Sequence, residues 1–225
     1  AVLRKCAQKI AAGEKDKINV TPAMVKAMLG PEKVKPTFIS RTDAVGIANG
    51  LAWTSVGGEM LPIEVSIIPN GSGKVEITGS LGDVMKESAH LALTYARVHA
   101  ETYHIAPDKF KNTDIHIHAP EGAVPKDGPS AGVTLTTALI SALSEIPVRH
   151  DLAMTGEITL HGNVLPIGGL KEKSMAAFRE GISTVLIPEA NKPDLYEVDD
   201  EVKKAVKFIP VSDLSQVLKH ALILP

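Results

Sequence analysis

The residue best suited to chemistry is a serine set between a loop rich in proline and glycine and a helix. Ser130 lies within residues 125–132 (PKDGPSAG), and the residues that follow predict a single helix with a broad apolar surface. Pro129 fixes φ just ahead of Ser130. The N–H groups of a first helical turn lack partners inside the helix, and the helix dipole favours negative charge there. This position would stabilise an alkoxide or the oxyanion of a tetrahedral intermediate.

The position of Ser130 allows two interpretations. Serine is a preferred N-cap residue, so Ser130 could simply cap the helix. Gly128, Pro129 and Gly132 crowd the backbone around it, however, and a capping serine requires none of them. Because a serine without an activating base is a poor nucleophile, the nucleophile hypothesis requires a base elsewhere in the chain.

A histidine could supply the base, as in the nucleophile elbow of α/β-hydrolases. Residues 128–132 satisfy the pattern G-x-S-x-G, which requires a strand directly before the serine and an acid and a histidine after it. Pro125 and Pro129 are poor residues for a central strand, so we do not favour the elbow. Three histidines are candidates, none with a matching acid in a persuasive setting: His150, His161 and His220.

A lysine could also supply the base, because a desolvated amine loses its proton more easily. Lys171 and Lys173 flank Glu172 at the start of a predicted helix. Burial and the positive end of a helix both lower the pKa of a lysine, as a base at neutral pH requires. Helical periodicity does not decide between the two lysines, although it places Lys171 slightly nearer the apolar stripe. Both could equally be ordinary solvated charges.

Two other patterns with chemical potential are weaker. The turn at residues 69–73 resembles a phosphate-binding loop, but Ile68 replaces its first glycine and Val75 replaces the serine or threonine that would hold magnesium. His116 and His118 share one face of a predicted strand and could be metal ligands. No carboxylate stands at a matching interval, so we expect a polar strand face and no metal site.

Composition restricts the class of protein. The chain has 225 residues, of which 44% are hydrophobic and 22% charged, with a net charge of -2. This balance is typical of a globular domain and suggests neither nucleic acid nor membrane as a partner. Cys6 is the only cysteine, which excludes an internal disulfide and a zinc site of several cysteines and favours a reducing compartment. No apolar run is long enough to span a bilayer.

The elements that must position these residues mix strands and helices without a regular βαβ period. This predicts an α/β (α+β) fold and argues against a doubly wound sheet or an eight-stranded barrel. Asp83 and Ser212 are predicted to cap the first and last helices of this region. The predicted strands cover 45–53, 60–68 and 74–78 (these two as a hairpin), 114–119, 152–160 and 164–167 (a second hairpin), 182–187 and 206–211, and the predicted helices cover 84–103, 131–143, 170–180, 191–205 and the residues after 212.

The first thirty residues form a separate region. Residues 1–12 predict a helix, 18–20 a brief strand, and Thr21 and Pro22 the start of a second helix that ends near Gly30. A module of about thirty residues does not fold alone, so we expect 1–30 to be the tail of a preceding domain. Residues 31–37 are expected to form a linker, and the chain to be a piece of a longer polypeptide.

Six segments carry a resemblance to a known family. Residues 51–58, 79–87, 117–122, 125–132, 155–160 and 164–173 (the last VLPIGGLKEK) together resemble the proteolytic domain of Lon, the ATP-dependent serine protease. The likeness runs in order from about residue 38 to 221, and residues 1–30 resemble the end of the helical subdomain of Lon's AAA+ module. The resemblance implies a compact Lon-type domain over 38–225, made of mixed small sheets with flanking helices.

The resemblance also implies roles for named residues. Ser130 corresponds to the nucleophile and Lys173 to the general base, which overrules the slight periodicity preference for Lys171. Thr155 is expected to hold the lysine amine, and Asp127 and Glu157 to be charged neighbours that tune or block the site. The substrate is expected to pair along 51–58, in a groove shaped by Trp53, Gly57, Gly58, Gly122, Val124 and Pro125.

Cofactors and partners follow from the resemblance alone. This fragment has no Walker motif and needs no cofactor or metal, whereas the full-length family protein uses ATP and magnesium. The family acts on misfolded, unfolded or tagged proteins, assembles as a six-membered ring, and is expected in the cytoplasm. Two rival classes stay open: an esterase that uses a histidine, and a ring scaffold without catalysis.

Overall fold

The computed structural model describes residues 1–13, 17–30, 39, 41–55, 57–120 and 125–224. The chain divides into two compact units, residues 1–36 and 37–225. The expected linker at 31–37 lies outside the described residues. The larger unit contains every residue with a predicted catalytic role.

The smaller unit is a pair of helices, α1 (Val2–Ala11) and α2 (Pro22–Leu29). Thr21 caps α2 as predicted, since its Oγ1 accepts a hydrogen bond of 3.3 Å from the Met24 N–H. The strand predicted at 18–20 is wrong: these residues are irregular, and the described part of this unit offers no strand for them to pair with.

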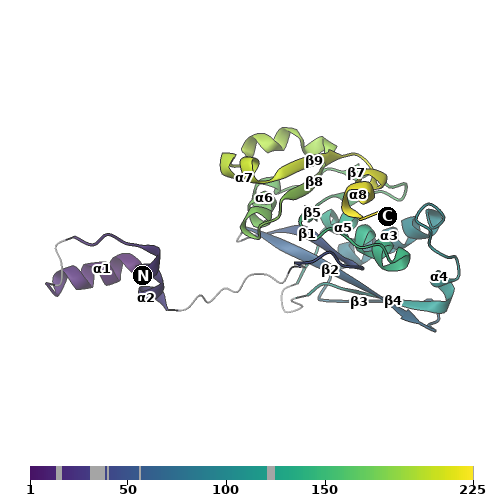
Figure 1. Ribbon diagram of the computed structural model, residues 1–225, viewed down its shortest axis with the longest axis horizontal. Helices are drawn as coiled ribbons and strands as arrows, with labels where there is room; N and C mark the ends of the chain where they lie inside the picture. Colours follow the sequence, from purple (N-terminus) through teal and green to yellow (C-terminus); the bar gives the residue numbers. More distant parts are fainter. Residues whose placement is uncertain (14–16, 31–38, 40, 56, 121–124, 225) are drawn as a thin grey trace. The chain divides into compact units, whose positions relative to one another are not determined.

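The larger unit is built on a mixed sheet of seven strands in the order β3-β4-β2-β1-β5-β8-β9 (Figure 1). β2 is antiparallel to both β1 and β4, whereas the remaining neighbours are parallel. The strands are β1 (Ile47–Thr54), β2 (Gly57–Pro69), β3 (Val75–Thr78), β4 (Thr113–His118), β5 (Leu152–Met154), β8 (Thr184–Pro188) and β9 (Lys207–Val211). β6 (Glu157–Ile158) and β7 (Val164–Leu165) form a short hairpin, so the second predicted hairpin is right only at this end; the first part of its predicted strand 152–160 is β5, which joins the main sheet. Strands and helices are mixed as expected, and the α/β class is confirmed.

Two hydrophobic clusters cover the two faces of the sheet. The first joins Ala48 of β1 to α3 (Asp83–Val98), α5 (Gly132–Ser144) and α8 (Leu214–Ala221). The second joins Leu51 of β1 to α6 (Leu170–Arg179) and α7 (Asp200–Ala205). Ala48 and Leu51 are three positions apart and therefore point to opposite faces. α5 is buried from Gly132 to Leu143, which makes it the central helix. No described helix is long and apolar enough to cross a membrane.

The hairpin predicted from 60–68 and 74–78 is wrong. β4 lies between β2 and β3, pairing antiparallel with the first and parallel with the second. Asp114 at the start of β4 organises the intervening turn, because its Oδ1 accepts hydrogen bonds from Ser72 N–H (2.7 Å) and Lys74 N–H (2.9 Å). A turn signal between two strands cannot reveal that a strand from forty residues later separates them.

The N-terminus of α3 is capped from outside the helix. Asp83 is its first residue, and no side chain adjacent in sequence caps it. The Oδ1 of Asp127 instead accepts a hydrogen bond of 3.1 Å from the Met85 N–H. α3 also ends at Val98, five residues before the predicted end at Tyr103.

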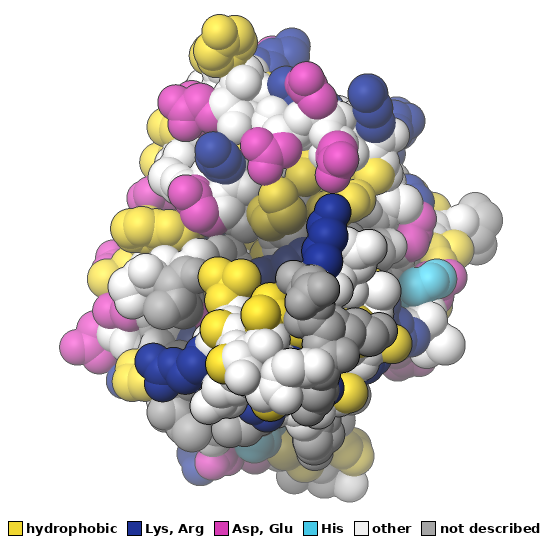
Figure 2. Space-filling view, turned by 90° about the vertical axis from the view of Figure 1, so that its left-hand side faces the viewer, with side chains coloured by type: hydrophobic (Ala, Val, Ile, Leu, Met, Phe, Trp, Pro, Cys, Tyr) yellow, Lys and Arg dark blue, Asp and Glu magenta, His cyan; other side chains and the backbone are white. Residues whose placement is uncertain are grey.

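The C-terminal third differs from prediction in two details. The acidic stretch 191–205 is broken into η2 (Glu189–Asn191), η3 (Pro193–Glu197) and the short α7. Acidic side chains mixed with basic ones gather in the upper part of Figure 2, where α7 lies in Figure 1. Asp213, and not Ser212, caps α8, with its Oδ1 3.1 Å from the Gln216 N–H. Elsewhere in the larger unit, the 3₁₀ helix η1 (Pro129–Ala131) precedes α5, and the short α-helix α4 spans Lys109–Asn112.

The central position of α5 makes its leucines the most costly to truncate. Leu139 is fully buried, so Leu139→Ala is expected to lower the free energy of unfolding by about 2–5 kcal/mol. Leu160 is 51% exposed, and the same change there is expected to cost less than about 1 kcal/mol. Urea denaturation of both variants measures the difference, and equal midpoints would contradict the assignment of α5 to the core.

Candidate active site

Ser130 lies on a 3₁₀ turn that leads directly into α5. The predicted transition from loop to buried helix is therefore present, although the first turn is η1 and the α-helix itself begins at Gly132. The carbonyl of Ser130 accepts a hydrogen bond of 2.8 Å from the Gly156 N–H, and the Gly156 carbonyl accepts one of 3.1 Å from the Val133 N–H. These bonds fasten the serine turn to the segment between β5 and β6.

A glycine permits this close approach. A Cβ at Gly132 would lie 2.9 Å from Ile158 Cγ1 and 3.1 Å from the Ile158 backbone nitrogen. Any larger residue would therefore push α5 away from β6 and displace the turn that carries Ser130. This contact explains why residue 132 is glycine, which would not be required if Ser130 only capped the helix.

The structure brings Lys173 to Ser130. Lys173 lies in the first turn of α6, and its Nζ is 3.0 Å from Ser130 Oγ. The side chain is only 3% exposed, whereas Lys171 is exposed. The slight periodicity preference for Lys171 is therefore wrong as a guide to which lysine is buried beside the serine.

Burial changes the acidity of this amine. Removal from water disfavours the charged form and lowers the pKa of Lys173 from its ordinary 10.5 to about 8. With that pKa, roughly a tenth of the amine is neutral at pH 7, and half is neutral near pH 8. An uncharged amine 3.0 Å from a hydroxyl can accept its proton.

Thr155 completes the arrangement from the end of β5. Its Oγ1 accepts a hydrogen bond of 3.2 Å from Lys173 Nζ and donates one of 3.5 Å to the Ser130 carbonyl. The residue is 1% exposed, and its N–H donates to the Leu186 carbonyl of β8 at 3.2 Å. Thr155 thus anchors the amine to the rigid centre of the sheet.

Among the described residues, no hydrogen bond or ion pair joins the two predicted acidic neighbours to the Ser130–Lys173 pair. The Oδ1 of Asp127 accepts from Gly128 N–H at 2.9 Å as well as from Met85 N–H, so this carboxylate is engaged at the start of α3. Glu157 is half-buried in β6, and within the described residues no hydrogen bond or ion pair joins it to Ser130 or Lys173. Asp127 lines the same cavity as the pair, whereas Glu157 is not among the described residues that line it.

A cavity of about 710 Å³ opens over the serine and the lysine. Of the predicted groove residues, Trp53 and Pro125 line it, Gly57 and Gly58 do not, and Gly122 and Val124 lie outside the described residues. Sequence reasoning missed the apolar wall formed by Met60, Leu61, Met85, Pro166 and Ile167. In the sequence these residues are distinguished only by their hydrophobicity, which does not show whether an apolar residue lines a cavity or lies in the core.

Gly58 lies under α6 instead of beside the cavity. A Cβ on Gly58 would stand 1.9 Å from the Glu172 carbonyl oxygen, so only glycine allows β2 to approach the first turn of this helix so closely. Gly58 also pairs with Trp53 in the β1–β2 ladder. The hairpin that carries Trp53 therefore supports the helix that carries Lys173.

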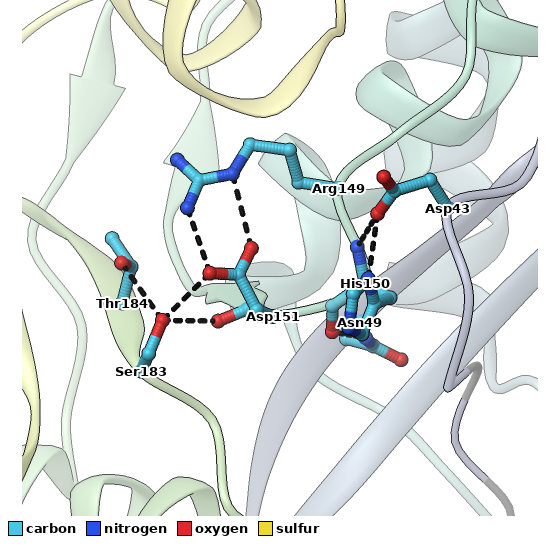
Figure 3. A network of polar contacts seen from close by, with 7 residues as sticks. All are labelled: Asp43, Asn49, Arg149, His150, Asp151, Ser183 and Thr184. Carbon is cyan, nitrogen blue, oxygen red and sulfur yellow. Dashed lines mark hydrogen bonds and ion pairs between the residues drawn. The ribbon is translucent and has the colours of Figure 1, made fainter.

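The histidines weighed as alternative bases are not in this cavity. Figure 3 shows His150 facing Asp43, and its Nδ1 lies 2.6 Å from Asp43 Oδ1. The neighbouring Asp151 binds Arg149 and Ser183 in the same network. Among the described residues that line the cavity there is no histidine, and a loop, not a strand, precedes Ser130.

His116 and His118 share a hydrogen-bonding partner. Thr78 Oγ1 lies 2.9 Å from His116 Nε2 and 2.7 Å from His118 Nδ1. No group of three or more candidate ligands suited to a metal ion exists in the part of the chain that the structure describes. The two histidines therefore form a polar strand face, but neither is among the described residues that line the cavity over Ser130 and Lys173.

The buried amine also affects stability. Below pH 8 the folded chain holds a charged Lys173 out of water, at a cost of about 3 kcal/mol relative to the ordinary pKa of 10.5. Between pH 8 and 10.5 the unfolded chain binds more protons at this site, so its contribution to stability rises with pH.

Lys173→Met is therefore expected to raise the free energy of unfolding at pH 7 by about 1–2 kcal/mol, after allowance for the hydrogen bonds lost at Ser130 and Thr155. The gain is expected to shrink by pH 10. Urea denaturation at both pH values measures it, with the exposed Lys171→Met as the matched control. A destabilised Lys173→Met at pH 7 would contradict the burial argument.

Comparison with known proteins agrees with this geometry. Residues 19–224 match the family described as "Lon protease (S16) C-terminal proteolytic domain". Proteins named Lon protease are similar: that of Trichlorobacter lovleyi is 54% identical over 98% of this chain, that of Brevibacillus choshinensis 51% over 98%, and Lon protease 1 of Myxococcus xanthus 52% over 99%. The chain spans only 27–28% of the length of these relatives. The resemblance carried by the six sequence segments is confirmed, and the chain belongs to the Lon protease (S16) family as its C-terminal proteolytic domain.

Proposed function

We propose that this chain hydrolyses peptide bonds, with Ser130 as the nucleophile and Lys173 as the general base. The observation that carries the proposal is the distance of 3.0 Å between Lys173 Nζ and Ser130 Oγ, at an amine whose pKa burial lowers to about 8. Membership of a serine peptidase family supports it. A capping serine has no need of a buried lysine.

The reaction proceeds through an acyl-enzyme. Neutral Lys173 accepts the hydroxyl proton as Ser130 Oγ attacks the carbonyl carbon of the scissile bond. Backbone N–H groups near Ser130, at the start of η1, stabilise the oxyanion. The protonated amine gives its proton to the leaving nitrogen, and the lysine then activates the water that releases the acyl group. Thr155 holds the amine in place throughout.

The substrate binds as an extended strand beside β1. β1 pairs with β5 only at Asn49 and Gly50, so in the described residues the edge of 51–54 on that side has no neighbouring strand. This edge borders the cavity, and Trp53 lies there 61% exposed. Main-chain pairing would hold the peptide, and the apolar wall would accept its side chains. Trp53, Gly122, Val124 and Pro125 form the groove in this proposal, with Gly57 and Gly58 behind it.

The remaining assignments concern the whole protein. Residues 1–30 are the tail of an AAA+ module, which uses ATP and magnesium to unfold misfolded or tagged proteins and pass them to a ring of six proteolytic domains. The protein acts in the cytoplasm, consistent with a single cysteine. These proposals rest on the family, of which this chain represents about a quarter of the length.

Removal of either member of the pair tests the mechanism. Ser130→Ala and Lys173→Ala are each expected to lower kcat for a fluorogenic peptide by at least about 10³-fold, because nucleophile and base act as a unit. Lys171→Ala is the matched control and is expected to retain full activity. A serine-directed boronate is expected to modify Ser130. Full activity of Ser130→Ala would refute Ser130 as the nucleophile. Loss of activity in a histidine variant, with Lys173→Ala still active, would favour the esterase class instead.

The pH dependence of the rate tests the base separately. Because the amine must be neutral, kcat/KM is expected to rise about tenfold per pH unit below pH 8 and to level off above it. Single-substrate kinetics from pH 6 to pH 10 measure this limb. A rate that is flat from pH 6 to pH 9 would exclude Lys173 as the base.

A further inference from the structure

Arg179 makes one conspicuous contact outside the reacting groups. Its Nη2 donates a hydrogen bond of 2.8 Å to the carbonyl of Gly58. Arg179 lies seven residues after Glu172 in α6, so both occupy the same face of the helix, about 10 Å apart along its axis. Long helical side chains lean towards the N-terminus, which carries the guanidinium back towards the first turn.

Gly58 is therefore held against α6 at two points. Its Cα approaches the Glu172 carbonyl so closely that a Cβ would stand 1.9 Å from that oxygen, and its own carbonyl is bound by Arg179. The next residue of α6 after Glu172 is Lys173. The distance between Lys173 Nζ and Ser130 Oγ therefore depends on the packing of α6 against Gly58.

We propose that Arg179 is a positioning residue that clamps α6 to the β1–β2 hairpin and thereby fixes Lys173 Nζ against Ser130 Oγ. The same hairpin pairs Gly58 with Trp53. The clamp therefore fixes the position of Lys173 relative to the edge of β1 that faces the substrate. This inference rests on the proposed function of Ser130 and Lys173.

The electrostatic surroundings of the amine determine how the clamp can be detected. The charged groups that line the cavity with Lys173 are Glu59 from β2, Lys126 and Asp127 from the loop before Ser130, and Glu172 from α6. Arg179 is not among them, so its removal leaves these charges in place. Loosening of α6 would instead admit water to Lys173 and move its pKa back towards the ordinary 10.5.

The test is the pH profile of peptide hydrolysis by Arg179→Met. The rising limb of kcat/KM is expected to move about 0.5–1 pH unit upwards, so that activity at pH 7 falls about 3–10-fold and recovers to within about 2-fold of the wild type above pH 9.5. Arg179→Lys, which keeps a donor, is expected to recover most of the activity at pH 7. If Arg179→Met does not fold, Arg179→Gln, whose side chain is shorter than that of arginine and uncharged, is measured in the same way.

Arg41→Met is the matched control. Arg41 also binds the end of α6, through the Glu180 carbonyl (2.8 Å) and carboxylate (3.2 Å), and within the described residues no hydrogen bond or ion pair joins it to the hairpin. The rising limb of kcat/KM for Arg41→Met is expected to lie at the same pH as in the wild type. An unshifted limb in Arg179→Met, or a loss equal at every pH, overturns the clamp. Lys173→Ala measured alongside separates the two proposals, because activity in that variant would refute the proposed base itself.

Discussion

The site depends on keeping one amine out of water. Lys173 is 3% exposed although it lines the cavity beside Ser130, and this burial lowers its pKa into the range where it can accept a proton. No counter-ion contributes to the shift. The folded chain bears a cost of about 3 kcal/mol for this amine at neutral pH, which the core must offset. The low pKa that the proposed role as base requires and the stability of the fold are thus opposed at a single side chain.

Three separate elements have to converge to create that environment. Ser130 comes from the turn before the buried helix α5, Thr155 from the end of β5, and Lys173 from α6. α5 and α6 cover opposite faces of the sheet, so the pair meets only where β5 ends and the sheet no longer separates them. Backbone contacts at Gly132 and Gly58 set the spacing on each side.

Sequence predicted well what local chemistry determines. The loop-to-helix transition at Ser130 and the hairpin of β6 and β7 follow from nearby proline, glycine and apolar residues. It failed where the partner is distant: β4 separates two strands that look like a hairpin, and Asp127 caps a helix forty residues before it. The choice of Lys173 over Lys171 required the family resemblance. Helical periodicity shows which face of α6 is apolar, but it does not show which of two nearby lysines is buried where α6 meets the end of β5. The roles assigned to Ser130, Lys173 and Thr155 stay predictions, although the structure brings them together.

The brevity of β5 has a consequence for selectivity. Because β5 has only three residues, the far end of β1 has no neighbouring strand on that side among the described residues. A peptide that paired with β1 there would be recognised by its backbone amide groups, which are the same in nearly every residue. Under the proposed binding mode, this site would distinguish conformation better than sequence. An extended, locally unfolded polypeptide would fit, a helix or a compact surface would not, and a proline would lack the N–H for pairing. Folded proteins would then escape hydrolysis because they offer no extended segment, and no sequence motif would be needed for this selectivity.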